Sequence, residues 1–279
     1  MKKAILGVFL CLSLAVLGFS QGFSIKVNGG ANFLMGGDYN QIVQGVNDFW
    51  HASSGVTVSS DLKKLSMGWN FGAEFIYNFT DQMGLGLGVG YITASNESTI
   101  AMSLGAATQS YTYRPSASVI PITLNFHYFL PIGDTMKIHF SAGPGLYIST
   151  FTFENQWELP ILLIDLTQIF SPDGVMAFGF QGGLGLEIDL SPGISLCVDV
   201  LGRMANMSGL TGGWTVAGTI FGIPVSDSGT GTLYYYESGG YPSGTIDDTL
   251  PSGSGISSAR EASVSLSGVC ALVGLKINI

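Results

Sequence analysis

Histidine is the residue type in this chain best suited to chemistry, and the sequence contains only three. His127 and His139 become cross-strand neighbours if a turn at residues 132–134 pairs Pro131 with Thr135. Adjacent imidazoles can bind a metal or act as a proton-sensitive gate, because histidine titrates near physiological pH. The sequence places no third ligand beside them, so two histidines packed in the interior are the alternative. We expect no metal site and no cofactor.

Eight charged residues form the second candidate group, because they fall on one side of alternating segments. They comprise four bases and four acids: Lys26, Lys137, Arg203, Lys276, Glu74, Glu187, Asp189 and Asp199. Buried charges persist when they are paired. A balanced set therefore predicts an internal salt-bridge network, whereas a selective pore would carry an excess of one sign.

The sequence contains no spacing typical of a catalytic site. His51 is the third histidine, and no serine, histidine and acid are brought together. Cys197 and Cys270 could form a disulfide after export, or stay apart because they would lie at different heights. Phosphate-binding loops, paired-cysteine metal motifs and the basic patches of nucleic-acid-binding proteins are missing from the sequence. We expect neither enzyme activity nor nucleic-acid binding.

The elements that position these residues are indicated by the composition. Of 279 residues, 10% are charged and 40 are glycine, whereas about a quarter of a soluble domain is charged and about 7% is glycine. After residue 20 no window offers the 18 or so consecutive apolar residues of a spanning helix. Only helices and closed barrels satisfy every backbone group in lipid, so the sequence predicts a membrane β-barrel.

Eight segments alternate between apolar residues and small or polar ones, as barrel strands do between lipid and interior. In residues 83–91 the odd positions are apolar and the even positions are all glycine. The other segments are 23–35, 67–79, 118–130, 136–150, 176–190, 194–204 and 269–279. Their apolar faces carry no charge, which at the bilayer midplane would cost about 2–4 kcal/mol for Arg or Lys. A soluble sandwich would show more charge on its other face.

The connections differ in length in a regular way. Three short ones, 80–82, 132–134 and 191–193, alternate with four long ones, 36–66, 94–117, 151–175 and 205–262. Short periplasmic turns and long extracellular loops are typical of bacterial outer-membrane barrels. With an even number of strands, both ends of the barrel are expected at the periplasmic rim.

The long connections contain three segments with a pattern of their own. Asp38 could cap a helix over residues 39–51. Residues 159–170 could lie at the membrane interface or extend a hairpin. The fourth connection is either a mobile surface loop or a recognition site, since Tyr234 to Tyr236 lie among the Gly and Ser residues that adapt to ligands.

The N-terminal segment predicts export. Lys2 and Lys3 precede an apolar run from Ala4 to Leu17, and small residues follow before Gln21. This is the pattern of a secretory signal peptide. We therefore expect a signal peptide at residues 1–20 and one barrel domain at residues 21–279.

The eight segments, together with residues 120–129 (IPITLNFHYF) and 142–147 (AGPGLY), resemble small outer-membrane β-barrel domains of the OmpA, OmpX and OmpW type. The resemblance implies an eight-stranded barrel whose lipid-facing surface contacts the outer membrane and which the barrel-assembly machinery inserts. Two features depart from the family. The chain ends in Ile279, where the family usually has an aromatic residue, and no peptidoglycan-binding domain is expected.

We therefore predict an all-β fold: an eight-stranded antiparallel up-and-down barrel in the outer membrane of a diderm bacterium. The expected role is structural or in surface interaction, with a plugged lumen and an external ligand held by the long loops. A narrow channel or small-solute porin is the alternative, favoured by the glycine-lined face of residues 83–91. Adhesion is a third possibility.

Overall fold

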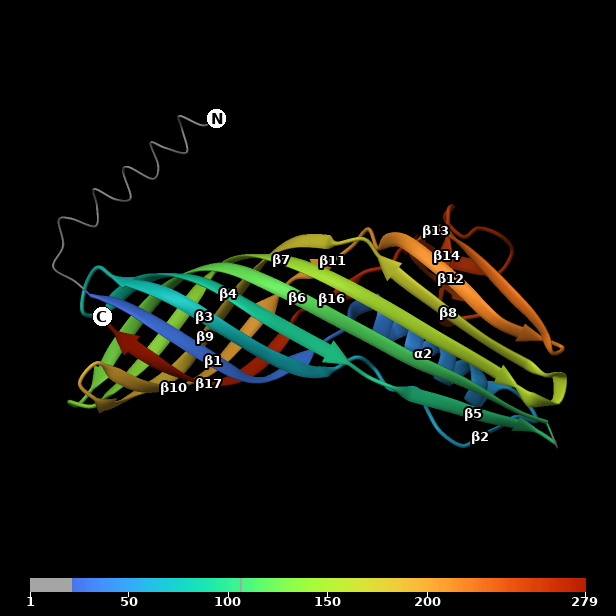
Figure 1. Cartoon of the computed structure of the whole chain (residues 1–279), viewed down its shortest axis with the longest axis horizontal. Helices are drawn as coiled ribbons and strands as arrows, with labels where there is room; N and C mark the ends of the chain where they lie inside the picture. Colours follow the sequence, from blue (N-terminus) through green and yellow to red (C-terminus); the bar gives the residue numbers. More distant parts are fainter. Residues whose placement is uncertain (1–21, 106) are drawn as a thin grey trace, which may run out of the picture.

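Eight strands pair side by side in a closed circuit in the computed structural model, which describes residues 22–105 and 107–279. They are β1 (Phe23–Leu34), β3 (Met67–Asn78), β4 (Met83–Ser95), β6 (Ala107–Ile132), β7 (Met136–Leu159), β9 (Val175–Ser191), β10 (Ile194–Met204) and β17 (Gly268–Asn278). Each pairs antiparallel with the next, β6 pairs with β7, and β17 returns to β1 (Figure 1). The predicted all-β antiparallel architecture is confirmed. The predicted signal peptide lies outside the described residues.

The alternating pattern sends apolar side chains outward from this ring. On β4 the glycines at 84, 86 and 88 are buried, whereas Leu85, Leu87 and Val89 are 40%, 59% and 54% exposed. Large apolar side chains elsewhere on the ring are equally open, and Phe178 is 85% exposed. Such a continuous apolar surface is stable only where lipid covers it, because soluble proteins rarely expose large apolar patches.

The three short turns and both ends of the ring lie together, at what we call the turn end. Ser24 lies opposite Asn278, and the Asn278 amide donates a hydrogen bond to the carbonyl of Gly193 in the third turn. In Figure 1 the last strand, β17, ends beside the beginning of β1. The predicted position of both ends beside the short turns is confirmed.

The four long connections form a second, ordered half of the molecule, which we call the distal half. It contains α2 (Gly37–Ala52), β2 (Thr57–Val58), β5 (Ser98–Leu104), η1 (Pro160–Leu162), β8 (Ile164–Pro172), β11 (Asn206–Met207), β12 (Thr211–Ile220), β13 (Ile223–Ser238), β14 (Tyr241–Asp247), β15 (Ile256–Glu261) and β16 (Val264–Ser265). Strands β6 and β7 run into it without a break, with Ser110 paired to Glu158. At about 3.3 Å per residue, the 26 residues of β6 extend roughly 80 Å, well beyond the width of a bilayer.

The sequence predicts loops for much of this half, but the structure shows strands. The prediction fails because the apolar side chains here point inward, whereas in the ring they point outward. In the part of β6 that precedes residue 118, the inward positions are apolar, and Tyr113 and Ala117 are buried. Phe151 and Phe153 on β7 are buried in the same way. The pattern of outward apolar side chains therefore ends where the ring leaves the membrane, and it does not predict the strands beyond that point. Residues 159–170 extend a hairpin, one of the two alternatives, because β8 pairs with β7.

Helix α2 packs on the apolar core of the distal half. Ile42 and Val43 are buried there, and the Asn40 side chain donates to the carbonyl of Leu65. The predicted helix over 39–51 is confirmed, but the predicted cap is wrong. Gly36 is the N-cap residue, with φ 73°, and Asp38 makes no cap because its carboxylate is held by residues of the chain after β15.

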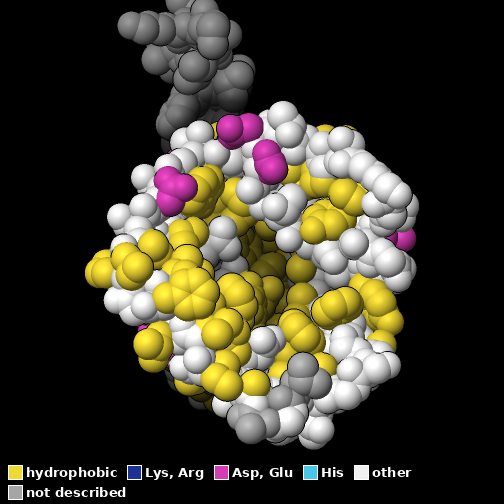
Figure 2. Space-filling model, turned by 90° about the vertical axis from the view of Figure 1, so that its right-hand side faces the viewer, with side chains coloured by type: hydrophobic (Ala, Val, Ile, Leu, Met, Phe, Trp, Pro, Cys, Tyr) yellow, Lys and Arg dark blue, Asp and Glu magenta, His cyan; other side chains and the backbone are white. Residues whose placement is uncertain are grey.

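The outer end of the distal half is hollowed. Figure 2, viewed onto this end, shows a depression lined by hydrophobic side chains and acidic side chains on its rim. Among the residues that the structure describes, no helix is long and apolar enough to cross a membrane.

Candidate functional site

A chain of polar contacts crosses the lumen of the ring. The Lys26 Nζ lies 2.7 Å from Asp199 Oδ2, and Asp199 Oδ1 lies 3.3 Å from His139 Nδ1. His139 Nε2 lies 2.6 Å from His127 Nδ1, and His127 Nε2 lies 3.0 Å from Glu74 Oε1. Strands β1, β10, β7, β6 and β3 each supply one member. These five side chains therefore link strands from all around the ring.

The glycine face of β4 makes room for this chain. A Cβ atom added at Gly86 would lie 2.5 Å from both Glu74 Oε1 and His127 Nε2. Because alternate β4 residues face the lumen, any larger residue there would occupy the space of the glutamate–histidine contact. The glycine run thus serves to accommodate bulky polar side chains from neighbouring strands.

A second cluster of charges lies toward the turn end. The Lys276 Nζ lies 3.0 and 3.2 Å from the two carboxylate oxygens of Glu187 and 4.2 Å from the centre of the Phe129 ring. The Lys137 Nζ is 3.5 Å from Glu187 and 3.7 Å from Asp189. Lys137 is the most open of these bases, with a side chain 31% exposed, so its pairs are the weakest.

The two lumen histidines touch, but not through the register that the sequence suggested. The turn pairs Ile132 with Met136, so Ser141 lies opposite His127 and Phe129 lies opposite His139. The rings meet diagonally, with centroids 4.9 Å apart. Each ring nitrogen already faces a neighbour in a linear chain, and within residues 22–105 and 107–279 no three metal-ligating side chains converge.

A match to known proteins agrees with this architecture. The family model described as outer membrane protein beta-barrel domain matches residues 9–226. The chain belongs to this family. The protein is therefore an outer-membrane protein, as predicted, and the distal half with its long connections is the extracellular half, while the turn end is periplasmic.

Two solved structures are similar over most of the chain. The crystal structure of the outer membrane protein OprG from Pseudomonas aeruginosa is 12% identical, with 94% of this chain and 98% of that chain covered and a TM-score of 0.39. The solid-state NMR structure of outer membrane protein AlkL in DMPC bilayers is 12% identical, with 94% and 92% covered and a TM-score of 0.26. No curated protein sequence matches the chain.

Arg203 of the outer-membrane barrel departs from the expected pairing. It faces the lumen from β10 and is 4% exposed, yet no carboxylate of the described chain lies within 4.0 Å of its guanidinium (Lys26, Lys137, Lys276 and Arg114, by contrast, have partners). The nearest polar contact is the Cys270 Sγ, 3.9 Å from Nη2. The equal number of bases and acids in the sequence does not predict this. Glu74 contacts His127 instead of one of these bases, and Glu187 pairs with both Lys137 and Lys276.

Cys197 and Cys270 are both free and buried. Cys197 lies opposite Gly274, whereas Cys270 lies opposite Leu201. The two cysteines are therefore four positions apart along adjacent strands, about 13 Å at 3.3 Å per residue. This is too far for a disulfide, so of the two alternatives the unpaired one is correct.

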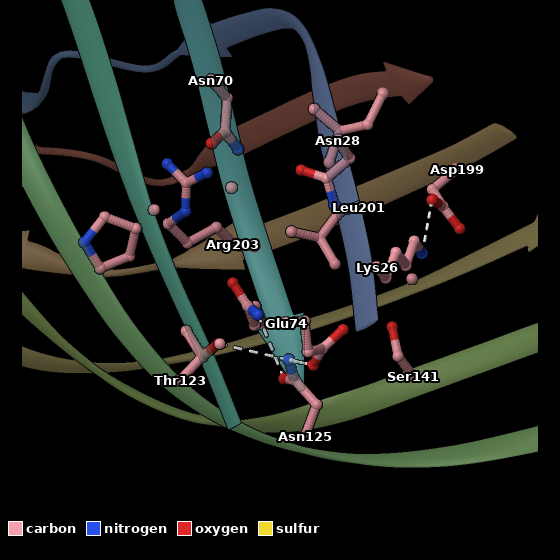
Figure 3. A pocket seen from close by; sticks show the side chains of 18 of the residues that line it. Lys26, Asn28, Asn70, Glu74, Thr123, Asn125, Ser141, Asp199, Leu201 and Arg203 are labelled. Carbon is pink, nitrogen blue, oxygen red and sulfur yellow. Dashed lines mark hydrogen bonds and ion pairs between the residues drawn. The ribbon is translucent and has the colours of Figure 1, made fainter. Parts of the chain in front are cut away.

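The lumen also contains a cavity of about 80 Å³, lined in part by Lys26, Asp199, His139 and Glu74 of this chain of contacts. Figure 3 shows Arg203 and Asn70 on one side of it and the Lys26–Asp199 pair on the other, with Glu74 and Asn125 between them and Thr123 below Arg203. Asn125 donates to Glu74 Oε1 at 2.7 Å, and the Gln181 amide donates to Asn125 at 3.1 Å.

A second cavity, of about 170 Å³, lies in the extracellular half and was missed by the sequence analysis. Its wall is mainly aromatic and aliphatic: Tyr39, Ile42, Tyr111, Tyr113, Phe153, Asn155, Gln168, Phe170, Leu233, Gly244, Thr245 and Ile246. Burial raises the pKa of Tyr39, Tyr111 and Tyr113, so their hydroxyls stay neutral. The available signal was the inward apolar alternation of residues 107–117 and 151–153, which a search for lipid-facing strands ignores.

Within the extracellular half, the buried carboxylate of Asp38 joins helix α2 to the segment from Arg260 to Ser263. Asp38 accepts hydrogen bonds from Arg260 Nη2 at 2.8 Å and from the Ser263 amide and hydroxyl at 3.0 Å. Arg260 in turn lies over the Tyr235 ring at 4.0 Å. Burial alone would raise the pKa of Asp38, but the hydrogen bonds from Arg260 and Ser263 outweigh it and lower that pKa.

Proposed function

We propose that this protein is a barrel closed to solutes, without catalytic activity, that acts at the cell surface through its extracellular half. The observation that carries the proposal is the chain of contacts from Lys26 through Asp199, His139 and His127 to Glu74, which spans the lumen. A continuous aqueous path past these side chains would require the contacts to open.

The energetics favour the closed arrangement. The side chains of Lys26 and Asp199 are 5% and 9% exposed. Separating a buried pair by losing one partner typically costs about 3–5 kcal/mol, and the interior of an eight-stranded barrel is only wide enough for its own side chains or one small ligand. The cavity of about 80 Å³ beside the pair has room for a few waters but for no solute of ordinary size.

The extracellular half adds a second barrier and a platform. Its apolar core includes Leu65, Ile100, Phe151, Met207 and Leu210, each 1% exposed or less. This core lies above the charged chain and is covered by α2. A well-ordered half of this size outside the membrane supports a role in surface interaction.

Single-channel recording in planar bilayers tests the closed lumen. We expect the wild-type protein to show no steady open level, while a Lys26→Ala/Asp199→Ala double variant, which removes the bridging side chains, should conduct more. Lys63→Ala in the first long connection is the matched control and should remain silent. Heat-modifiable migration in gels verifies that each variant is folded. A steady open level in the wild type contradicts the proposal.

Capture of a small apolar solute is the second candidate, favoured by the aromatic cavity of about 170 Å³ and by the hydrophobic depression of Figure 2. Pockets for small ligands are mainly apolar with a few polar groups, and here Asn155 and Gln168 supply those groups. Binding at this position requires no passage through the lumen.

A fluorescent apolar probe such as N-phenyl-1-naphthylamine tests this second candidate. Ile246 lines the cavity, whereas Ile223 is 65% exposed at a hairpin tip. We expect Ile246→Asp to weaken probe binding at least tenfold, because an uncompensated charge in an apolar site is costly, and Ile223→Asp to leave it unchanged. Equal affinity in the two variants would exclude this cavity as the binding site.

A further inference from the structure

The guanidinium of Arg203 is a buried positive charge without a counter-charge. It is 4% exposed, and its Nε and Nη1 atoms have no hydrogen-bond partner among the described residues. A buried charge is costly unless it is paired and hydrogen-bonded, and an arginine does not lose its proton in proteins. The group therefore requires a negative charge that the described chain does not supply.

The neighbours of Arg203 in the described chain are polar but uncharged. Nη2 donates to the Cys270 Sγ at 3.9 Å, and the Asn70 side-chain amide donates to the same sulfur at 3.6 Å. The third neighbour of that cysteine is Asn32, which lies opposite it on β1, is 1% exposed, and has an unpartnered Nδ2. On the far side the Tyr147 ring lies 5.7 Å from the guanidinium, and Gln181 lies opposite Arg203 on β9, but neither side chain supplies a negative charge.

The nearest carboxylate on the same strand is already occupied. Asp199 is four residues from Arg203 on β10, about 13 Å at 3.3 Å per residue, and it is engaged by Lys26 and His139. Glu74 is likewise held, by His127 and Asn125. Neither can move to Arg203 without breaking these contacts, which would leave Lys26 unpaired in the case of Asp199.

A space of suitable size adjoins the guanidinium. Arg203, Asn70 and Asn28 line the lumen cavity of about 80 Å³ (Figure 3). A cavity of this measure needs only about 10–15 Å³ for one water, so it has room for a small ion together with several waters. It is too small for a large organic anion.

We propose that Arg203 holds a small inorganic monovalent anion of the halide class in this cavity, with the Asn70 amide as a second donor. The anion supplies the charge that Arg203 lacks and accepts hydrogen bonds from Nε and Nη1. It is a stationary ion of the folded lumen, independent of any ligand of the extracellular half and of whether the lumen conducts.

Bromide provides a direct probe. Crystals of the refolded protein soaked in sodium bromide should show an anomalous peak within hydrogen-bonding range of the Arg203 guanidinium. In detergent solution, the wild-type Tm in bromide should exceed that in sodium gluconate of equal ionic strength by about 2–4 °C, since a ligand that binds only the folded state stabilises it. Gluconate is too large for the cavity.

Variants separate this site from general salt effects. Arg203→Met should lose the bromide-dependent increment, and Asn70→Ala should require more bromide for the same increment. Lys137→Met is the matched control, because it removes another lumen base whose charge is already paired, and it should keep the increment. The anomalous measurement on the wild type tests the proposal even where a variant fails to fold. Density that fits only water beside Arg203, or an increment that persists in Arg203→Met, would overturn it.

Discussion

Replacing Lys26 by methionine tests the lumen chain most directly. The substitution keeps the length of the side chain and removes only the ammonium that lies 2.7 Å from Asp199. Loss of one partner of a buried pair costs about 3–5 kcal/mol, because the other charge stays buried and uncompensated. Asp199 retains His139 at 3.3 Å, so we expect a cost near the lower limit, about 3 kcal/mol.

Two further variants test whether the cost of Lys26→Met comes from the uncompensated charge of Asp199. Lys26→Met/Asp199→Leu removes both charges and should recover most of the lost stability, since apolar replacement of a buried pair is often neutral. Lys137→Met is the matched control: its side chain is 31% exposed and its partners lie at 3.5 and 3.7 Å. Exposed pairs contribute about 0–1 kcal/mol, so this change should cost at most about 1 kcal/mol.

Equilibrium urea unfolding in lipid vesicles, followed by tryptophan fluorescence, measures these free energies. The wild type and the three variants should share one m-value, so that midpoint shifts report stability alone. If Lys26→Met costs no more than Lys137→Met, or if the double variant is less stable than Lys26→Met, the Lys26–Asp199 contact does not contribute as a buried pair and the reasoning is refuted.

Three further outcomes are expected. Because folding lowers the pKa of Asp38, its contribution to stability is complete above the unfolded value of about 3.9 and is lost as pH falls through the lower folded value. Hydrogen-exchange protection factors in α2, which correct for the intrinsic pH dependence of exchange, should therefore fall below about pH 4, and Asp38→Asn should remove that fall. Gly86→Ala should destabilise the barrel by about 1–3 kcal/mol through overpacking, whereas Gly174→Ala, whose Cβ would meet nothing within 4 Å, should not; urea midpoints compare the two. Leu163 is 64% exposed with φ 53°. Leu163→Gly should leave the urea midpoint unchanged or raise it, because glycine adopts this conformation without a Cβ clash. A clearly lower midpoint would show that the Leu163 side chain makes a stabilising contact.

The lipid-facing belt was predictable because its signal is local. Alternation along one strand depends only on neighbouring residues, so Met83 to Tyr91 and the seven similar segments could be identified without knowing their partners. The inward direction of Lys26, Glu74 and Asp199 follows from the same period of two. The short turns and the helix after Gly36 were predictable for the same reason, because their signals also lie in neighbouring residues.

The partners of the inward side chains were not predictable, because they depend on register and on reach across the ring. Lys26 lies directly opposite Glu74 in the β1–β3 register, yet its ammonium pairs with Asp199 on β10. The His127–His139 contact likewise survives a register different from the one expected, because imidazoles reach diagonally. Counting charges could not show that Arg203 would be left over.

The sequence by itself determined that this chain is a barrel with an uncharged outer belt, since a periodic pattern and the cost of charge in lipid act residue by residue. Only the tertiary structure decided that the extracellular connections form an ordered half with its own apolar core, because there the apolar face turns inward and depends on contacts between distant strands. It alone also decided which lumen charges are paired and which cation lacks a partner. Those outcomes are set by the positions of groups far apart in sequence, which no local pattern contains.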